Sequence, residues 1–332
     1  MNGESSSKGD LVKLTDSLTT EADARRMFEG LRWPKGVRCA MPDCGGSEVY
    51  RISVKGKTLK SGRKVGPREL FKCKACRRQF TVTKGTIFED SHIPLRTWLV
   101  VMYRMCSSKK SVSARQIERE FGLSHRAAWF MCHRIRWAMT DKNPPKLSGT
   151  VEADETYVGG KLRGHSKHRQ VEGKGETMKA SMTATWAKRT PVFGMVERGG
   201  RVRAKVMKPV TQDAIEREVF NGVDRSKTHL MTDAFPIYSN MEKMLPHDVI
   251  RHESEYVRGE VHTQNIESFW AVLKRGLIGT YHHVDAAYLH QYVGEYEFRH
   301  NTRQIKDVER FMALASQTEG RLDWYVGDQA AS

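Results

Sequence analysis

Apolar residues recur at helical spacing in four stretches of the first 140 residues. From Thr20 onward, one helix face carries apolar side chains at four positions: Ala24, Met27, Phe28 and Leu31. Three further helical stretches follow at 94–107, 113–120 and 125–139. Pro94 suits the first turn of its helix, where the N–H group that proline lacks is not needed. The pattern predicts a short N-terminal helix and a separate helical segment over residues 91–143.

The region between these helices is rich in Gly, Cys and Lys and alternates apolar and polar residues in short runs. The runs EVYRISV, RELFKCK and RQFTVTKGT each have the alternation of a short strand. The intervening segment 55–67 has no apolar core and is expected to be an exposed loop. The polar residues 1–19 are expected to form a disordered tail, and residues 313–332 a C-terminal tail.

A linker rich in Pro and Gly, DKNPPKLSG at 141–149, cannot continue a helix and marks the main domain boundary. Beyond it, strand-like and helix-like stretches alternate. Strands are predicted at 150–160, 178–187, 191–197, 201–207, 228–235 and 247–253, and helices at 211–220, 235–245, 265–277 and 285–301. We therefore expect an α/β domain over residues 148–312, behind a helix and ribbon module over residues 20–90.

Charge is distributed unevenly along the chain. The net charge of +17 arises almost wholly between residues 31 and 150, where 26 Lys and Arg residues face 8 Asp and Glu residues. Residues 151–332 are nearly balanced, with 26 against 25. So basic a segment indicates a polyanionic partner, most often a nucleic acid. No run of about 18 apolar residues is present, so no membrane span is expected. The N-terminus lacks the apolar stretch of a signal peptide, which favours the cytoplasm.

Four of the six cysteines occur as two close pairs: Cys39 with Cys44, and Cys73 with Cys76. In a cytoplasmic chain, paired cysteines favour a bound metal over disulfides. Four thiolates satisfy the tetrahedral preference of a structural Zn²⁺ ion and leave no open position for catalysis. The sequence therefore predicts a zinc ribbon, with Lys74 and Arg77 beside the second pair as candidate DNA contacts.

Residues 111–139 have the layout of a helix-turn-helix. Ser113 can cap the first helix, Gly122 lies in the turn, and Ser124 can cap the second helix. A motif of this kind places its second helix in the DNA major groove. The alternative is a plain helical hairpin with one basic face. The candidate DNA contacts on the second helix are Arg126, Arg134 and Arg136.

Three acidic residues of the second domain lie where separate elements can bring them together. Asp154 is on the first predicted strand, with Glu152 on the same face and Glu155 on the opposite face. Asp233 lies at the end of a later strand, and Glu267 opens a helix. Two-metal phosphoryl transfer needs carboxylates that converge from separate elements on a pair of Mg²⁺ ions. These acids are therefore a candidate magnesium site.

The segments that carry these acids resemble the ISXO-type insertion-sequence transposases of the DDE superfamily. The similar segments are VEADETYVGGK, HLMTDAF and VHTQNIESFWAVLKRGLIGTYHHV, with EFRHNTR after them. The stretch FKCKACRRQFTVTKGTIFEDSHIPLRTW resembles the front of the same family. The resemblance covers roughly residues 20–310, and QNIESFWAVLKRG is its most specific part.

The resemblance implies a fold, an activity and partners. The fold would be a ribonuclease-H-like mixed sheet with flanking helices, preceded by the zinc ribbon and a helix-turn-helix-like domain. The activity would be cleavage at the ends of the insertion sequence and joining of the 3′-hydroxyl to target DNA, with two Mg²⁺ or Mn²⁺ ions. The expected partner is DNA, bound by a homo-oligomer in the cytoplasm, at a bacterial nucleoid.

The resemblance maps Asp154 and Asp233 onto the first two catalytic acids of the family. The third position is open, because some relatives have Asn there and this sequence offers both Asn265 and Glu267. Glu267 lies 34 residues after Asp233 and seven before Lys274, and both spacings are typical of the family. A carboxylate also binds Mg²⁺ better than a neutral amide does. We favour Glu267, keep Asn265 as its rival or partner, and expect Lys274, on the same helix face as Glu267, to bind a DNA phosphate.

Three other functions are compatible with parts of the sequence. A structure-specific nuclease of the same fold would cut DNA without joining it. A transcriptional regulator would use the zinc ribbon and helix-turn-helix and carry an inactive second domain, although the intact acids argue against this. A zinc enzyme is disfavoured by the four cysteine ligands.

Overall fold

The computed structural model describes residues 10–58, 61–62, 64–65, 68–159, 189–250, 262–320 and 322. The chain divides into two units: unit 1 comprises Met1–Met139 with Ile305–Trp324, and unit 2 comprises Thr140–Gln304 with Tyr325–Ser332. The sequence predicts a second domain that extends to residue 312. The structure instead places helix α10 (Asp307–Ser316) in unit 1, because Phe311 packs its ring 5.9 Å from that of Tyr103.

Helices make up much of unit 1, and capping residues set several of their ends. They are α1 (Asp10–Ser17), α2 (Glu21–Arg32), α3 (Leu95–Ser107), α4 (Ala114–Phe121), α5 (His125–Met139) and α10. Thr20 starts α2 with a capping box, in which Thr20 and Asp23 each accept a hydrogen bond from the other's backbone N–H. Ser113 caps α4 as predicted, and Gly122 ends it at φ 63°. Residues 10–17 are helical, in place of the disordered tail expected there.

Three short strands form the ribbon of unit 1, in the order β1-β4-β5. β1 (Val49–Val54) pairs antiparallel with β4 (Arg68–Cys73), and β4 pairs antiparallel with β5 (Gln79–Phe80). A cluster of rings from Trp33, Phe71 and Phe80 packs beside these strands. Where the sequence predicts only a loop at 55–67, β2 (Lys57–Thr58) and β3 (Lys64–Val65) pair with each other.

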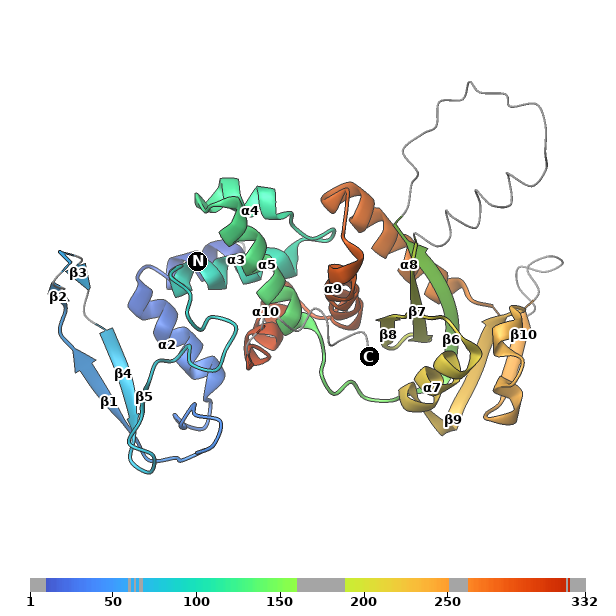
Figure 1. Cartoon of the computed structure of the whole chain (residues 1–332), viewed down its shortest axis with the longest axis horizontal. Helices are drawn as coiled ribbons and strands as arrows, with labels where there is room; N and C mark the ends of the chain where they lie inside the picture. The colour runs from blue at the N-terminus through green and yellow to red at the C-terminus, as the bar shows by residue number, and fades with distance from the viewer. Residues whose placement is uncertain are drawn as a thin grey trace, which may run out of the picture. The chain divides into compact units, whose positions relative to one another are not determined.

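Unit 2 contains a five-stranded mixed sheet in the order β10-β9-β6-β7-β8 (Figure 1). The strands β6 (Leu147–Val158), β7 (Thr190–Glu197) and β8 (Val202–Val206) are antiparallel to one another in turn. On the other side of β6, β9 (Val223–Asp233) and β10 (His247–Ile250) run parallel to it. The predicted α/β fold with a mixed sheet is confirmed, whereas the strand predicted at 178–187 lies outside the described residues.

Helical layers cover both faces of this sheet. One apolar layer contains α7 (Gln212–Gly222) and two 3-10 turns, Pro236–Tyr238 and Met241–Lys243. The other contains α8 (Gln264–Gly276) and α9 (Leu289–Asn301). The two turns replace the helix predicted at 235–245, because Ser239 and Asn240 between them favour turns. In the described ranges, no helix combines the length and apolarity needed to cross a membrane.

Candidate active site and zinc centre

The four paired cysteines converge on one point in unit 1. The Sγ atoms of Cys39, Cys44, Cys73 and Cys76 all lie within 4.8 Å of one another. The sulfurs of Cys39 and Cys76 are 3.7 Å apart, and those of Cys44 and Cys73 are 3.6 Å apart. A tetrahedral Zn²⁺ ion with bonds of about 2.3 Å would hold its sulfurs about 3.8 Å apart. The cluster therefore fits a structural zinc ion, as the sequence predicts.

Local sequence supports this cluster in two ways. A Cβ atom on Gly46 would lie 3.1 Å from Cys73 Sγ, so glycine leaves the space that the sulfurs need. The backbone N–H and the guanidinium of Arg78 lower the pKa of the Cys76 thiol to about 6, whereas burial raises the pKa of Cys39 to about 12. Zinc binding requires thiolates, so a bound cation would favour deprotonation at each sulfur.

Asp154 lies within β6, and Asp233 lies at the end of the neighbouring parallel strand β9. β6 and β9 pair as far as Glu152 beside Met231, two residues before each Asp, and the charge of Asp233 acts on Asp154. Asp233 ends β9, and its Oδ1 accepts a hydrogen bond from the Phe235 N–H at 3.1 Å. The first two predicted acids are therefore brought together by strand pairing.

Asp154 lies where its negative charge is disfavoured. Its pKa is raised to about 6, first by burial and then by the charge of Asp233, with a smaller contribution from Glu267. Trp270 Nε1, on α8, donates a hydrogen bond to Asp154 Oδ2 at 3.1 Å and acts in the opposite direction. A cation among these carboxylates would relieve their repulsion.

The three predicted acids are spaced more widely than the cysteines. In the part of the chain that the structure describes, the four-cysteine cluster alone brings three or more candidate metal ligands within 4.8 Å of one another. Two ions about 4 Å apart span a wider set of carboxylates than one ion does. Carboxylate oxygens are also the ligands that Mg²⁺ prefers. The donor set of Asp154, Asp233 and Glu267 therefore fits a pair of Mg²⁺ or Mn²⁺ ions in its chemistry.

A fourth carboxylate lies close to these acids. Glu155 Oε1 accepts a hydrogen bond from the Tyr238 hydroxyl at 2.6 Å, on the face of the sheet that α7 covers. Burial, together with the charges of Asp154 and Asp233, raises the pKa of Glu155 to about 7. Strand alternation predicts the opposite face for Glu155, but no sequence signal predicts its contact with Tyr238.

Helix α8 presents Glu267 and Lys274 as exposed residues, in its first and last turns respectively. Glu267 Oε1 accepts a hydrogen bond from the Thr263 hydroxyl at 3.0 Å. The first turn favours an acid and the last turn favours a base, because of the helix dipole. Both side chains are exposed, and their seven-residue spacing predicts that they share one face of α8.

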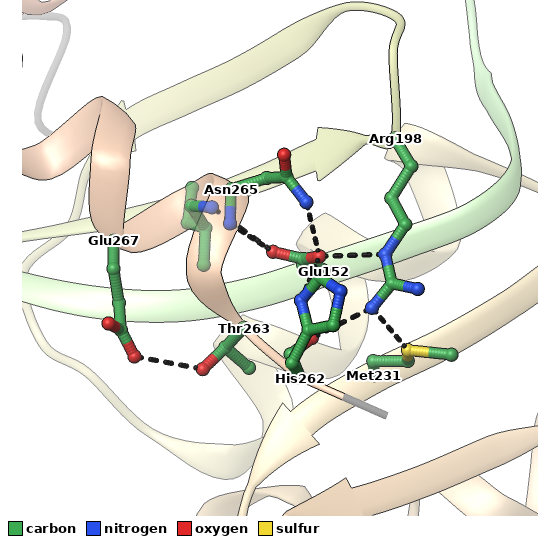
Figure 2. Close-up of polar contacts among 8 residues, drawn as sticks. Glu152, Arg198, Met231, His262, Thr263, Asn265 and Glu267 are labelled. Carbon is green, nitrogen blue, oxygen red and sulfur yellow. Dashed lines mark hydrogen bonds and ion pairs between the residues drawn. The ribbon is translucent and has the colours of Figure 1, made fainter. Parts of the chain in front are cut away.

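Asn265 is engaged with Glu152 (Figure 2). Its side-chain nitrogen donates to Glu152 Oε1 at 2.7 Å, and its backbone N–H donates to Glu152 Oε2 at 2.8 Å. In the same view, Glu267 turns away from Glu152 and toward Thr263. The rival third residue thus has a protein partner on the sheet, and no sequence signal pointed to that partner.

Two domain families match the parts of the chain that hold these features. The sequence model of the ISXO2-like transposase domain matches residues 146–301, which include the mixed sheet, α8 and α9. The transposase zinc-ribbon domain matches residues 19–79, which include the four cysteines. The two matches together indicate a transposase that contains an ISXO2-like transposase domain. The family of this domain indicates a DNA-cutting enzyme, and both domains imply DNA as its partner.

One curated relative and one solved structure also align with the transposase. An uncharacterized Halobacterium salinarum protein in the transposable element ISH50 is 29% identical over 265 residues, which are 79% of this chain and 84% of that protein. The cryo-EM structure of a simian T-cell lymphotropic virus intasome in complex with the PP2A regulatory subunit B56 gamma aligns with a TM-score of 0.28 and 11% identity. That alignment covers 60% of this chain and 65% of the other.

Two of the arginines predicted to contact DNA from α5, Arg134 and Arg136, have buried side chains. Arg134 Nη1 donates to the backbone carbonyls of Ile87 and Glu89, both at 2.9 Å, and its guanidinium lies over the Phe130 ring. Arg136 is 1% exposed. Because both side chains are buried, neither guanidinium is exposed for the predicted DNA contact.

The other predicted DNA contacts of the transposase are exposed. Arg126 lies in the first turn of α5, and Arg77 and Lys74 lie beside the zinc cluster. Lys74 pairs with Glu48 at 2.6 Å across the ribbon, so its charge is partly compensated. Ser124 caps α5 by accepting a hydrogen bond from the Ala127 N–H at 3.3 Å, as predicted.

Proposed function

We propose that the transposase cuts DNA at the ends of an insertion sequence and joins the resulting 3′-hydroxyl to target DNA. The observation that carries this proposal is the position of Asp154 on β6 near Asp233 at the end of the parallel strand β9, beside the helix that presents Glu267. The raised pKa of Asp154 supports it, because like charges gathered at one place are typical of functional sites. These three acids are the proposed catalytic residues.

We assign unit 2 to the ribonuclease-H-like fold and the α4–α5 pair to the helix-turn-helix class. In chain order, the five strands occupy the positions 3-2-1-4-5 across the sheet, with three antiparallel strands followed by two parallel ones. This order puts Asp154 on the central strand. The short turn at Gly122 and the exposed Arg126 support the second assignment.

Mg²⁺ or Mn²⁺ is the proposed catalytic cofactor. A pair of such ions would activate the attacking oxygen and stabilise the leaving oxygen of an in-line displacement at phosphorus. The chain's own part is to hold the carboxylates in place. The Trp270 indole orients Asp154, and the Thr263 hydroxyl orients Glu267. The Phe235 N–H does the same for Asp233.

DNA contacts are proposed at two places. In unit 2, Lys274 follows Glu267 on the exposed side of α8 and would bind a backbone phosphate near the reacting one. In unit 1, Arg126, Arg77 and Lys74 would hold the end sequence. We further propose that the transposase acts as a homo-oligomer on DNA, because two ends of one element have to be held together for joining.

A labelled oligonucleotide that carries the end of the insertion sequence tests the proposal. With Mg²⁺ and a target plasmid, the wild type is expected to yield a cleaved end and then a joined product. Asp154→Ala and Asp233→Ala are expected to abolish both products. Cleavage without joining would favour a nuclease of the same fold, and binding without cleavage would favour a regulator. Retained activity in Asp154→Ala would overturn the proposed site.

A further inference from the structure

A buried acid, Glu152, binds the start of α8 (Figure 2). Its side chain has no solvent exposure. It accepts hydrogen bonds from the N–H groups of Asn265 and Ile266, at 2.8 and 3.2 Å, and from Asn265 Nδ2 at 2.7 Å. Arg198 Nε, in the turn after β7, donates to it at 2.8 Å. His262 Nδ1 lies 3.2 Å from Glu152 Oε1, but these two atoms do not form a hydrogen bond.

Arg198 extends this group to a third segment. Its Nη2 lies 3.0 Å from the Met231 sulfur on β9 and donates to the His262 carbonyl at 3.1 Å. The contacts of Glu152 and Arg198 therefore tie β6, β9 and α8 together. Three residues of this group each lie two positions before a proposed catalytic acid. Glu152 precedes Asp154, Met231 precedes Asp233, and Asn265 precedes Glu267.

This spacing has a different geometric meaning on strands and on a helix. Residues two apart on a strand point to the same face, so Glu152 and Asp154 share one face of β6. Residues two apart on a helix point about 200° away from each other. Asn265 can therefore bind Glu152 while Glu267 points elsewhere, as Figure 2 shows.

We propose that Glu152 is a positioning residue for the metal-binding acids. By holding the first turn of α8 against β6, it fixes Glu267 relative to Asp154 and Asp233 and so sets their affinity for a divalent cation. This inference rests on the proposed function. It also assigns Asn265 the role of a partner of Glu152, in place of a metal ligand.

The negative charge of Glu152 is what the contacts require. The positive end of the α8 dipole and the Arg198 guanidinium both stabilise a carboxylate at this point. Gln would keep the shape of the side chain but replace one acceptor oxygen by an NH₂ donor, which would face other donors. Glu152→Gln therefore loosens the start of α8 and leaves every proposed metal ligand in place.

Glu295 offers a matched control in the same unit. Its side chain is also fully buried, and it accepts hydrogen bonds from Arg299 Nη2 at 2.8 Å and from the Tyr281 hydroxyl at 2.9 Å. Glu295→Gln thus also removes a buried carboxylate that is bound to an arginine, but this carboxylate lies on α9. Both substitutions are expected to lower the thermal midpoint.

The test is Mn²⁺ binding to the zinc-loaded full-length protein without DNA, with free Mn²⁺ measured by electron paramagnetic resonance. Asp154→Ala defines which sites depend on the acids. At those sites, Glu152→Gln is expected to raise the dissociation constant roughly 10–100-fold, whereas Glu295→Gln leaves it unchanged. Arg198→Lys keeps the charge but shortens the reach to Met231 and His262, and is expected to weaken binding several-fold.

Wild-type Mn²⁺ affinity in Glu152→Gln would overturn the proposal. Equal weakening in Glu295→Gln would also overturn it, because it would indicate a general loosening of unit 2. If Glu152→Gln does not fold, Arg198→Lys decides, and wild-type affinity there would overturn the proposal. Failure of the proposed function would look different, since the wild type would bind Mn²⁺ through Asp154 and still neither cut nor join DNA.

Discussion

The Trp270 indole donates a hydrogen bond to Asp154 and packs against Gly194, where the absence of a side chain leaves space for the ring. The indole Nε1 lies 3.1 Å from Asp154 Oδ2, and Gly194 is the residue that pairs with Asp154 on β7. A Cβ atom on Gly194 would lie 2.5 Å from Trp270 Cη2 and 2.7 Å from Cζ2. The position of the indole, and with it the orientation of Asp154, therefore depends on this glycine.

Gly194→Ala is expected to displace the indole and reduce cleavage of the DNA end. Overpacking of this kind costs about 1–3 kcal/mol, and a loss of about 1.4 kcal/mol at the transition state slows a reaction roughly tenfold. We expect at least that decrease in single-turnover cleavage. Gly279→Ala is the control, because a Cβ there would meet nothing within 4 Å. Cleavage at the wild-type rate by Gly194→Ala would show that Trp270 does not position Asp154.

Asp154→Asn is expected to stabilise the zinc-loaded protein when Mg²⁺ is absent. Because the pKa of Asp154 is 3.8 in its ordinary state and about 6 in the folded protein, the folded state holds more protons between these values. Wild-type stability therefore falls as the pH rises from about 4 to 6, and the neutral Asn escapes this loss. The gain is about 3 kcal/mol at pH 8 and about half of that at pH 5. Urea unfolding at both pH values measures it, and equal stability of the two proteins at pH 8 would contradict the account.

Loss of zinc is expected to abolish binding to the DNA end. The four-cysteine site contributes folding energy to a ribbon with few strands, so the ribbon should unfold without the ion. Cys73→Ser is expected to lose most of the zinc that the wild type holds, and to lose specific binding with it. Cys106→Ala is the control, because Cys106 is buried on α3 outside the cluster. Atomic absorption measures the zinc content of each protein. A wild-type zinc content in Cys73→Ser would contradict the account.

Arg126→Ala and Arg134→Ala are expected to fail in different ways. The exposed Arg126 can reach DNA, so its loss should weaken binding and reduce the salt dependence of the affinity by about one phosphate contact. Arg134 bonds two buried carbonyls, so its loss should lower the thermal midpoint of the protein. Fluorescence anisotropy at several salt concentrations, beside thermal unfolding, separates the two effects. A stable Arg134→Ala with weakened DNA binding would restore the original prediction for that residue.

Several elements of both units could be predicted because their signals are local. Ser113 and Gly122 bound α4 through hydrogen bonds and backbone angles that each involve a few neighbouring residues. The cysteine spacing similarly predicts the cluster, because each pair lies on one turn. The sequence also predicts a strand for Asp154 and a strand end for Asp233, and the parallel pairing of β6 with β9 then brings the two acids near each other.

The contacts between distant segments could not be predicted in this way. Glu152 and Asn265 are 113 residues apart, and no spacing rule connects them. Arg126 and Arg134 lie on one helix and carry the same charge, yet only packing decides that the second is buried. A position on a basic helix therefore predicts the charge of a side chain, but it does not predict whether that side chain is exposed.

The identity of the third acid is tested most directly by single-turnover cleavage of a labelled DNA end in Mg²⁺ by two variants, Glu267→Gln and Asn265→Ala. Glu267→Gln is expected to be slower than the wild type by roughly a thousandfold or more, because it removes a carboxylate that holds the metal ions. Asn265→Ala is expected to be slower by roughly 10–100-fold, because it loses only one bond to Glu152. Near wild-type cleavage by Glu267→Gln, with Asn265→Ala inactive, would contradict the account and make Asn265 the third ligand.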